Sequence, residues 1–172
     1  VQAQLNLGCM YSYGIDVTQS DSNAFKWFSK AAHQGLADAQ FNIGVMYSNG
    51  EGVKKNDVKA VEWYRKAAIQ GLAVAQYELA VMYFDGQGVA QDYSQALAWF
   101  NQAAKQDHVA AKALLGNMYV SGQGVTQDYS QAVEWYQQAA NQGDAVAQNN
   151  LGYLYQIGQG VTQSHSDALK WY

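Results

Sequence analysis

Residues 37–72 read ADAQFNIGVMYSNGEGVKKNDVKAVEWYRKAAIQGL, and residues 109–144 read VAAKALLGNMYVSGQGVTQDYSQAVEWYQQAANQGD. The two stretches have the same length of 36 residues and align without a gap, with shared glycine, tryptophan and alanine positions. The whole chain repeats in this way, and its five tryptophans recur every 36 residues, at Trp27, Trp63, Trp99, Trp135 and Trp171. A fixed period of this size is typical of stacked supersecondary units, each of which buries its apolar face against the next.

The chain of 172 residues divides into four complete copies and a shorter fifth copy. The copies are residues 1–36, 37–72, 73–108, 109–144 and 145–172, in a single array without a linker. Val1 begins within a predicted helix and Tyr172 stops within another, whereas terminal repeats normally carry polar caps. We therefore expect the chain to be an excerpt of a longer protein.

Each copy has the pattern of two helices. In the second copy, Ala39, Ile43 and Met46 have the spacing of one helical face. Gly50 predicts the end of this helix, because glycine accepts the left-handed backbone conformation. Asn56 is the expected N-cap of a second helix, which ends before Gly71. The sequence predicts an all-α protein of five helix pairs.

Two further expectations concern single positions of the repeat. Where Gly35, Gly71 and Gly143 close the second helix, the third copy has Asp107, which we expect to keep the same backbone because aspartate tolerates positive φ. We expect each tryptophan to be buried between the helices of its own and the next copy. Truncation of Trp99 to alanine would then cost about 3–5 kcal/mol.

Composition and charge exclude several classes of function. The chain has 10 Lys and Arg against 14 Asp and Glu, a net charge of −4, and it has no basic stripe. We therefore expect no nucleic-acid partner, since phosphate neutralisation needs clustered positive charge. No apolar stretch approaches the roughly 20 residues of a membrane span, so we expect no membrane insertion. The single cysteine, Cys9, excludes an intrachain disulfide and a multi-cysteine metal site.

The sequence also lacks motifs for chemistry. Its histidines, His33, His108 and His165, fall at three different positions of the repeat, and no metal-binding motif is present. The glycine-rich loops, such as Gly86–Gly88, lack the lysine and the spacing of a phosphate-binding loop. We predict no catalytic residue, no metal and no cofactor.

A family resemblance covers the whole chain. In the second copy it is carried by the runs 37–40 (ADAQ), 43–47 (IGVMY) and 50–53 (GEGV), and by Ala60, 62–64 (EWY), Ala67, Ala68 and Gly71. In these residues the chain resembles the Sel1-like repeat, a relative of the tetratricopeptide repeat. The resemblance implies a right-handed α–α superhelix (a solenoid) whose concave inner surface holds other proteins. It also implies bacterial relatives that are often extracytoplasmic; some carry one disulfide per repeat, from which this chain, with Cys9 alone, departs.

Seven aromatic residues are not required by the repeating framework, and five of them fall on one face of the first helices. This face is opposite to the apolar face, and in a tetratricopeptide-like stack it lines the concave groove. The candidate partner-binding residues on it are Tyr13, Phe41, Asn42, Val45, Asn49, Tyr77, Glu78, Val81, Phe84, Asn117, Asn149 and Tyr153.

Two interpretations of these aromatic residues stay open at this point. An exposed apolar-aromatic groove on a protein surface usually marks a partner site, and Tyr77→Ala or Phe84→Ala would then weaken binding. With tight curvature, neighbouring first helices would bury the same rings, and these substitutions would lower the melting temperature. Because Glu78 and Asp85 lie on this face without Lys or Arg in the second and third copies, we expect the groove to prefer neutral or basic segments.

The leading hypothesis for function is a non-catalytic interaction scaffold that binds a protein or peptide segment in its concave groove. The alternative is an accessory domain of a cell-envelope or cell-wall-related assembly, or a host-interaction factor. Few charges, abundant Gln and Asn and the habits of the family favour a periplasmic or secreted location, with the cytoplasm as the alternative.

Overall fold

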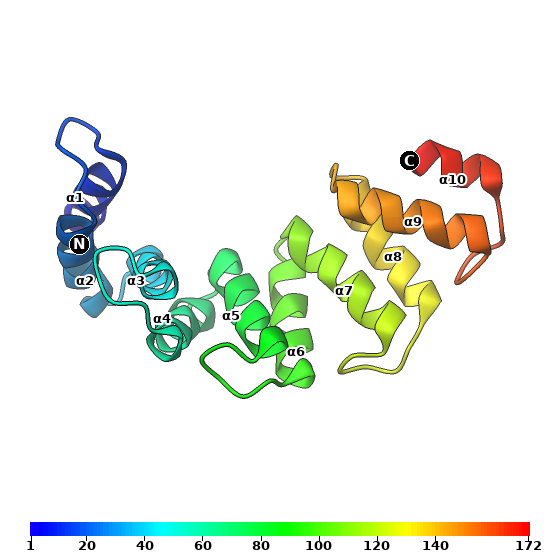
Figure 1. Ribbon diagram of the computed structural model, residues 1–172, viewed down its shortest axis with the longest axis horizontal. Coiled ribbons are helices and arrows are strands. Elements are labelled where there is room, and N and C mark those ends of the chain that lie inside the picture. The colour runs from blue at the N-terminus through cyan, green and yellow to red at the C-terminus, as the bar shows by residue number, and fades with distance from the viewer. The chain divides into compact units, whose positions relative to one another are not determined.

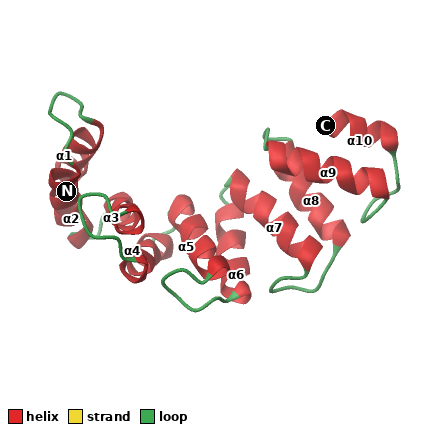
Figure 2. Cartoon of the chain, viewed as in Figure 1, coloured by secondary structure: helices red, strands yellow, loops and turns green.

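The computed structural model of the protein describes all 172 residues and contains ten α-helices and no strand (Figure 2). The first helices of the five repeats are α1 (Gln2–Tyr13), α3 (Ala37–Asn49), α5 (Ala73–Asp85), α7 (Val109–Ser121) and α9 (Ala145–Ile157). The second helices are α2 (Asp21–His33), α4 (Asp57–Ile69), α6 (Tyr93–Ala104), α8 (Tyr129–Ala140) and α10 (His165–Trp171). The prediction of five helix pairs is confirmed.

The predicted helix ends are also confirmed. Gly50 has a φ of 80°, and its N–H donates to the Met46 carbonyl at 2.9 Å. Across the loop, the side chain of Asn56 accepts from the Lys59 N–H at 3.0 Å. Asp107 has a φ of 61°, as expected for the residue that replaces glycine there.

The internal contacts divide the chain into two compact units within the third repeat. Unit 1 is Val1–Gln91 and holds α1 to α5, and unit 2 is Asp92–Tyr172 and holds α6 to α10. Within each unit, every helix packs against the next one along the chain. In unit 2, α8 packs against both α7 and α9, and α10 packs against α9 (Figure 1).

An aromatic ring of the second helix lies on a glycine of the first helix at the centre of a repeat. In the second repeat this pair is Tyr64 and Gly44, and in the fourth repeat it is Tyr136 and Gly116. A Cβ atom built on Gly116 would lie 2.5 Å from Cδ1 of Tyr136, and one on Gly44 would lie 2.6 Å from Cδ1 of Tyr64. In these two repeats a side chain at the glycine would collide with the ring, whereas the third repeat has Ala80 at the glycine position and Phe100 at the aromatic position.

The prediction that the tryptophans are buried is wrong. All five are half-buried, and in the first four repeats the residue after the tryptophan is the buried one, as in Phe100 and Tyr136. One step along a helix turns the side chain by about 100°, which moves the tryptophan to the edge of the helix contact. In unit 1 lysine side chains cover these rings, with Nζ of Lys66 3.9 Å from the ring centroid of Trp63. The cost of about 3–5 kcal/mol for a truncation belongs to the buried neighbour rather than to Trp99.

No helix exceeds 13 residues, and none combines the length and the apolar character of a membrane span.

Candidate functional site

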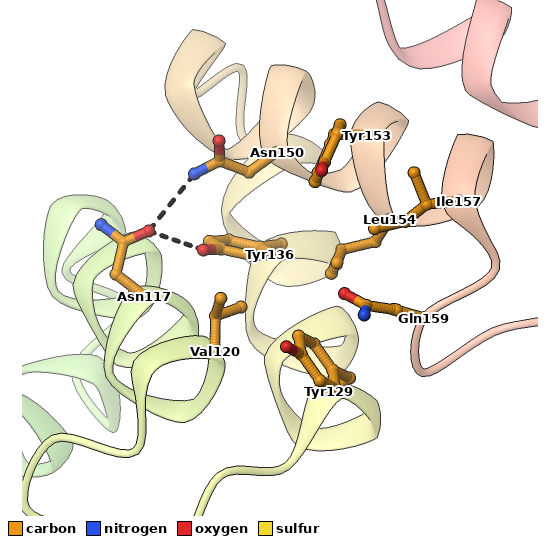
Figure 3. A pocket seen from close by; sticks show the side chains of 9 residues that line it. All are labelled: Asn117, Val120, Tyr129, Tyr136, Asn150, Tyr153, Leu154, Ile157 and Gln159. Carbon is orange, nitrogen blue, oxygen red and sulfur yellow. Dashed lines mark hydrogen bonds between the residues drawn. The ribbon is translucent and has the colours of Figure 1, made fainter.

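Unit 2 contains a cavity of about 540 Å³ formed by residues of α7, α8 and α9 and of the loop after α9. In Figure 3, Asn117 and Val120 on α7 face Tyr153 and Ile157 on α9, and Tyr136 of α8 lies between them. The lining residues include no charged side chain and are Asn117, Val120, Tyr129, Tyr136, Asn150, Tyr153, Leu154, Ile157 and Gln159. We call this cavity the Tyr136 pocket.

The polar part of the pocket is a hydrogen-bonded group from three helices. The Tyr136 hydroxyl donates to Oδ1 of Asn117 at 2.6 Å, and Nδ2 of Asn150 donates to the same oxygen at 3.2 Å (Figure 3). Burial raises the pKa of Tyr136 to about 12, partly offset by a hydrogen bond with Asn150. The phenol is therefore neutral at physiological pH and acts as the donor to Asn117.

The outer part of the pocket is aromatic and aliphatic. Tyr153 is 54% exposed and Ile157 is 37% exposed, whereas Leu154 beside them is buried. Gly160, at a φ of 73°, contacts the backbone of Tyr129, which brings the neighbouring Gln159 to the start of α8. The pocket thus has a buried polar floor and an exposed apolar rim.

The equivalent position in unit 1 is built differently. Tyr64, 72 residues before Tyr136, has its hydroxyl near the side chain of Ser48. Its ring lies 5.7 Å from the ring of Phe41, between centroids. Burial raises the pKa of Tyr64, the nearby negative charge of Glu78 raises it further, and the side chain of Ser48 lowers it. We call Phe41, Ser48, Tyr64 and Glu78 the Tyr64 site.

The candidate residues from the sequence lie in both units. Asn117 and Tyr153 come together in the Tyr136 pocket, while Asn149 is exposed and does not line it. In unit 1, Tyr13 is 75% exposed and Asn49 is exposed, with its amide bonded to Glu51 at 2.9 Å. The remaining candidates on α3 and α5 are half-buried and are Phe41, Asn42, Val45, Tyr77, Glu78, Val81 and Phe84.

Sequence reasoning missed the floor of the pocket because it assigned Tyr136 to the repeating framework. The same position of the repeat holds phenylalanine in Phe28 and Phe100 and tyrosine in Tyr64 and Tyr136, so packing alone does not need the hydroxyl. A buried tyrosine hydroxyl usually has a hydrogen-bond partner, so a tyrosine at this position could have indicated a polar neighbour such as Asn117.

A second cavity, of about 300 Å³, lies in unit 1 on the side of α2 and α4. It has a charged lining, in which Lys59 and Lys66 stand over the rings of Tyr47 and Trp63 and Glu62 lies beside them. None of the candidate residues from the sequence lines this cavity.

Reactive side chains are dispersed in the structure. No group of three or more His, Cys, Asp or Glu side chains is placed to hold a metal ion. His33 lies at the end of α2, His108 caps α7, and His165 begins α10. Burial raises the pKa of the Cys9 thiol, which disfavours the thiolate form that a nucleophile needs.

The repeated helix pairs are the architecture of a helical-repeat protein, and the Tyr136 pocket lies on its first helices. A family model described as the Sel1 repeat matches residues 1–36, 37–72, 73–108, 109–144 and 145–172, and the chain therefore belongs to the Sel1 repeat family. Proteins of this family are generally non-catalytic interaction scaffolds.

Solved structures support the same assignment. A protective antigen of uropathogenic Escherichia coli is 43% identical over 99% of this chain, with a TM-score of 0.98, and this chain spans 37% of its length. A Sel1 repeat protein of Oxalobacter formigenes is 39% identical over 99% of this chain and 70% of its own, with a TM-score of 0.96. A Sel1 repeat protein of Klebsiella pneumoniae is 25% identical over 99% of this chain and 83% of its own, with a TM-score of 0.60. No curated protein matches the chain.

Proposed function

We propose that this chain is an interaction scaffold that binds a protein or peptide segment through its first helices, and that the Tyr136 pocket receives one anchor side chain of that segment. The observation that carries the proposal is the open, uncharged cavity of about 540 Å³ with three tyrosines in its lining. Tyrosine is enriched among the residues that contribute most to binding at protein interfaces.

The lining of the pocket supports a particular kind of anchor. Val120, Leu154 and Ile157 offer apolar surface, so an aliphatic or aromatic side chain gains from leaving water there. Gln159 and the amide of Asn150 provide donors and acceptors for the backbone of an extended segment. With no charge in the lining, the pocket favours a neutral anchor.

The exposure of Tyr153 supports its role as a contact residue rather than a core residue. More than half of its surface is open to solvent in the free protein, so a partner gains by covering it. Its neighbour Leu154 is buried and belongs to the core of unit 2. Substitution of Tyr153 therefore separates binding from stability.

The test uses a random peptide library displayed on phage and selected on the immobilised wild-type chain. Selected peptides are synthesised, and their Kd values are measured for wild type, Tyr153→Ala and Tyr13→Ala. We expect Tyr153→Ala to weaken binding about 5- to 100-fold, the range of a contact residue worth about 1–3 kcal/mol. Tyr13→Ala is the comparison variant, because Tyr13 is an exposed candidate on a first helix of unit 1 that does not line the pocket, and it should weaken binding less than Tyr153→Ala does.

The melting temperatures of both variants complete the test. Unchanged melting with weaker binding of Tyr153→Ala supports the proposal. Peptides that bind Tyr153→Ala as well as wild type would move the site away from the Tyr136 pocket. If the library yields no binder while a screen of cell-wall glycans does, the alternative role in a cell-wall-related assembly replaces peptide binding.

We also propose an extracytoplasmic location, with a role in the cell envelope or in host contact. Support comes from the habits of the family and from the Escherichia coli relative, which is described as a protective antigen. Fractionation of the producing cell tests this location against a cytoplasmic marker protein. Co-fractionation with that marker would contradict it.

A further inference from the structure

We infer that the first helices of unit 1 bind a segment that carries a Lys or Arg side chain, whose positive end lies at Glu78 beside the rings of Tyr64 and Phe41. This inference rests on the proposed scaffold function and specifies the chemistry of the partner at the Tyr64 site. It commits to a basic protein segment as the occupant.

The charges of unit 1 are separated between its two sets of helices. Helices α1, α3 and α5 carry three carboxylates, Asp38, Glu78 and Asp85, and contain no Lys, Arg or His. Five of the Lys and Arg residues of unit 1 lie instead on α2 and α4. The face made by the first helices is therefore negative, and charge complementarity favours a basic partner there.

Glu78 has no positive partner within unit 1. It is half-buried, and none of the ion pairs and hydrogen bonds of the structure involves its carboxylate. The basic side chains nearest in sequence to Tyr64 have other contacts: Arg65 donates to the Tyr83 hydroxyl at 2.6 Å, and Lys66 stands over Trp63. A half-buried carboxylate without a partner gains more from an incoming cation than an exposed one does.

Aromatic rings lie next to this carboxylate. The repeat places Glu78 of α5 at the Tyr64 hydroxyl, because their equivalents in unit 2, Asn150 and Tyr136, both donate to Oδ1 of Asn117. Phe41 packs against the Tyr64 ring at 5.7 Å between centroids. A Lys or Arg side chain that reaches Glu78 can lay its aliphatic stem and its charged group against these rings. The site thus combines one carboxylate with an aromatic surface, the pair of features that recognises a cation on a flexible stem.

In unit 2 the equivalent positions of the repeat carry no charge. The equivalents of Glu78, Asp57 and Asp85 there are Asn150, Tyr129 and Ile157, all of which line the uncharged Tyr136 pocket. Three positions that are neutral in unit 2 are therefore acidic in unit 1. In unit 1, Oδ1 of Asp57 is buried without a hydrogen-bond partner, and the only cation near it is Lys55, with Nζ at 3.7 Å.

The test uses the same phage-displayed library, selected in parallel on the wild-type chain, on Glu78→Gln and on Glu62→Gln. Glu62 is the matched control, because it is an exposed glutamate on α4 of the same unit and the substitution removes the same charge. We expect wild type and Glu62→Gln to enrich peptides with Lys or Arg at a fixed distance from an apolar residue. Glu78→Gln should lose this enrichment.

Synthetic peptides then measure the pairing directly. For a selected peptide, the Kd of the Arg form and of its Arg→Gln form are measured with wild type and with Glu78→Gln. We expect the Arg→Gln change to weaken binding about tenfold with wild type and less than twofold with Glu78→Gln, as for a close pair of opposite charges. An equal effect with both proteins would overturn the inference.

The outcomes separate this inference from the proposed function. Wild-type binders without basic residues that still depend on Tyr153 would overturn the inference and leave the scaffold function standing. Basic peptides that bind Glu78→Gln unchanged would also overturn it, and a loss with Glu62→Gln instead would assign them to the cavity on α2 and α4. A library without any binder to the wild-type chain would contradict both.

Discussion

Tyr64 in unit 1 and Tyr136 in unit 2 occupy the same position of the repeat, and their rings are 3% and 2% exposed. Each ring lies on a glycine of the preceding helix, Gly44 or Gly116. Their hydroxyl groups meet different surroundings, since Tyr64 lies near Ser48 and the charged Glu78, while Tyr136 bonds to Asn117 in an uncharged pocket.

The comparison shows that one side chain combines a recurring packing contact with polar surroundings that differ between the two units. The ring lies on a glycine in four of the five repeats, with Ala80 in place of the glycine in the third, and the residues around the hydroxyl differ between the two units. Two sites with one backbone geometry can therefore differ in charge, which is how a repeat scaffold acquires specificity without a change of fold.

The largest expected effect tests the packing of the tyrosine ring, which the two sites share. Tyr64→Ala and Tyr136→Ala should each lower the free energy of unfolding by about 3–5 kcal/mol, because each leaves a large buried cavity. Urea denaturation monitored by circular dichroism measures this. The controls are Trp63→Ala and Trp135→Ala, at the half-buried residues next to these tyrosines. They should lower the free energy of unfolding by clearly less. A tryptophan variant that costs more than its tyrosine neighbour would contradict the packing described for both units.

A smaller effect tests the charge of Glu78, which distinguishes the Tyr64 site from the Tyr136 pocket. Burial raises the pKa of Glu78 above its ordinary value of 4.5. Between the pKa values of the unfolded and folded states, the folded chain binds more protons, so this group makes stability fall as pH rises through that range. Glu78→Gln should therefore be more stable than wild type at pH 7, by less than about 1 kcal/mol because the carboxylate is partly solvated.

This advantage of Glu78→Gln should shrink as the pH falls through the range above 4.5 and vanish below it, where Glu78 is protonated in both states. Thermal melting of both proteins from pH 4 to pH 8 follows the difference, with Glu62→Gln as the control for loss of one carboxylate. A constant difference across this range would show that the Glu78 carboxylate is not held in a desolvated position.

The smallest expected effect concerns the salt dependence of binding at the two sites. A peptide in the uncharged Tyr136 pocket should change its Kd by less than about twofold when the salt concentration rises from roughly 0.05 to 0.5 M, because no charge pair is screened. A peptide with its Arg at Glu78 should weaken by about threefold or more over the same range. Equal salt dependence at both sites would remove the distinction between them.

The repeating sequence by itself determined the helices, their ends and their order. The 36-residue period, Gly50 and Asn56 each predicted a feature that the structure has, because glycine and N-cap residues act on the backbone within a few residues of themselves. Even Asp107 was predictable, since its φ of 61° follows from the position it shares with three glycines.

Only the tertiary structure decided which side chains are buried and which polar groups meet. Trp135 and Tyr136 are adjacent and both recur in the repeat, yet a turn of about 100° puts one at the edge of the helix contact and the other at its centre. The Tyr136 hydroxyl bonds to Asn117 and lies near Asn150, which belong to two other helices. Exposure and hydrogen bonding of this kind depend on the distances between helices, and a sequence period fixes the direction of a side chain on its own helix but not its neighbours on the next.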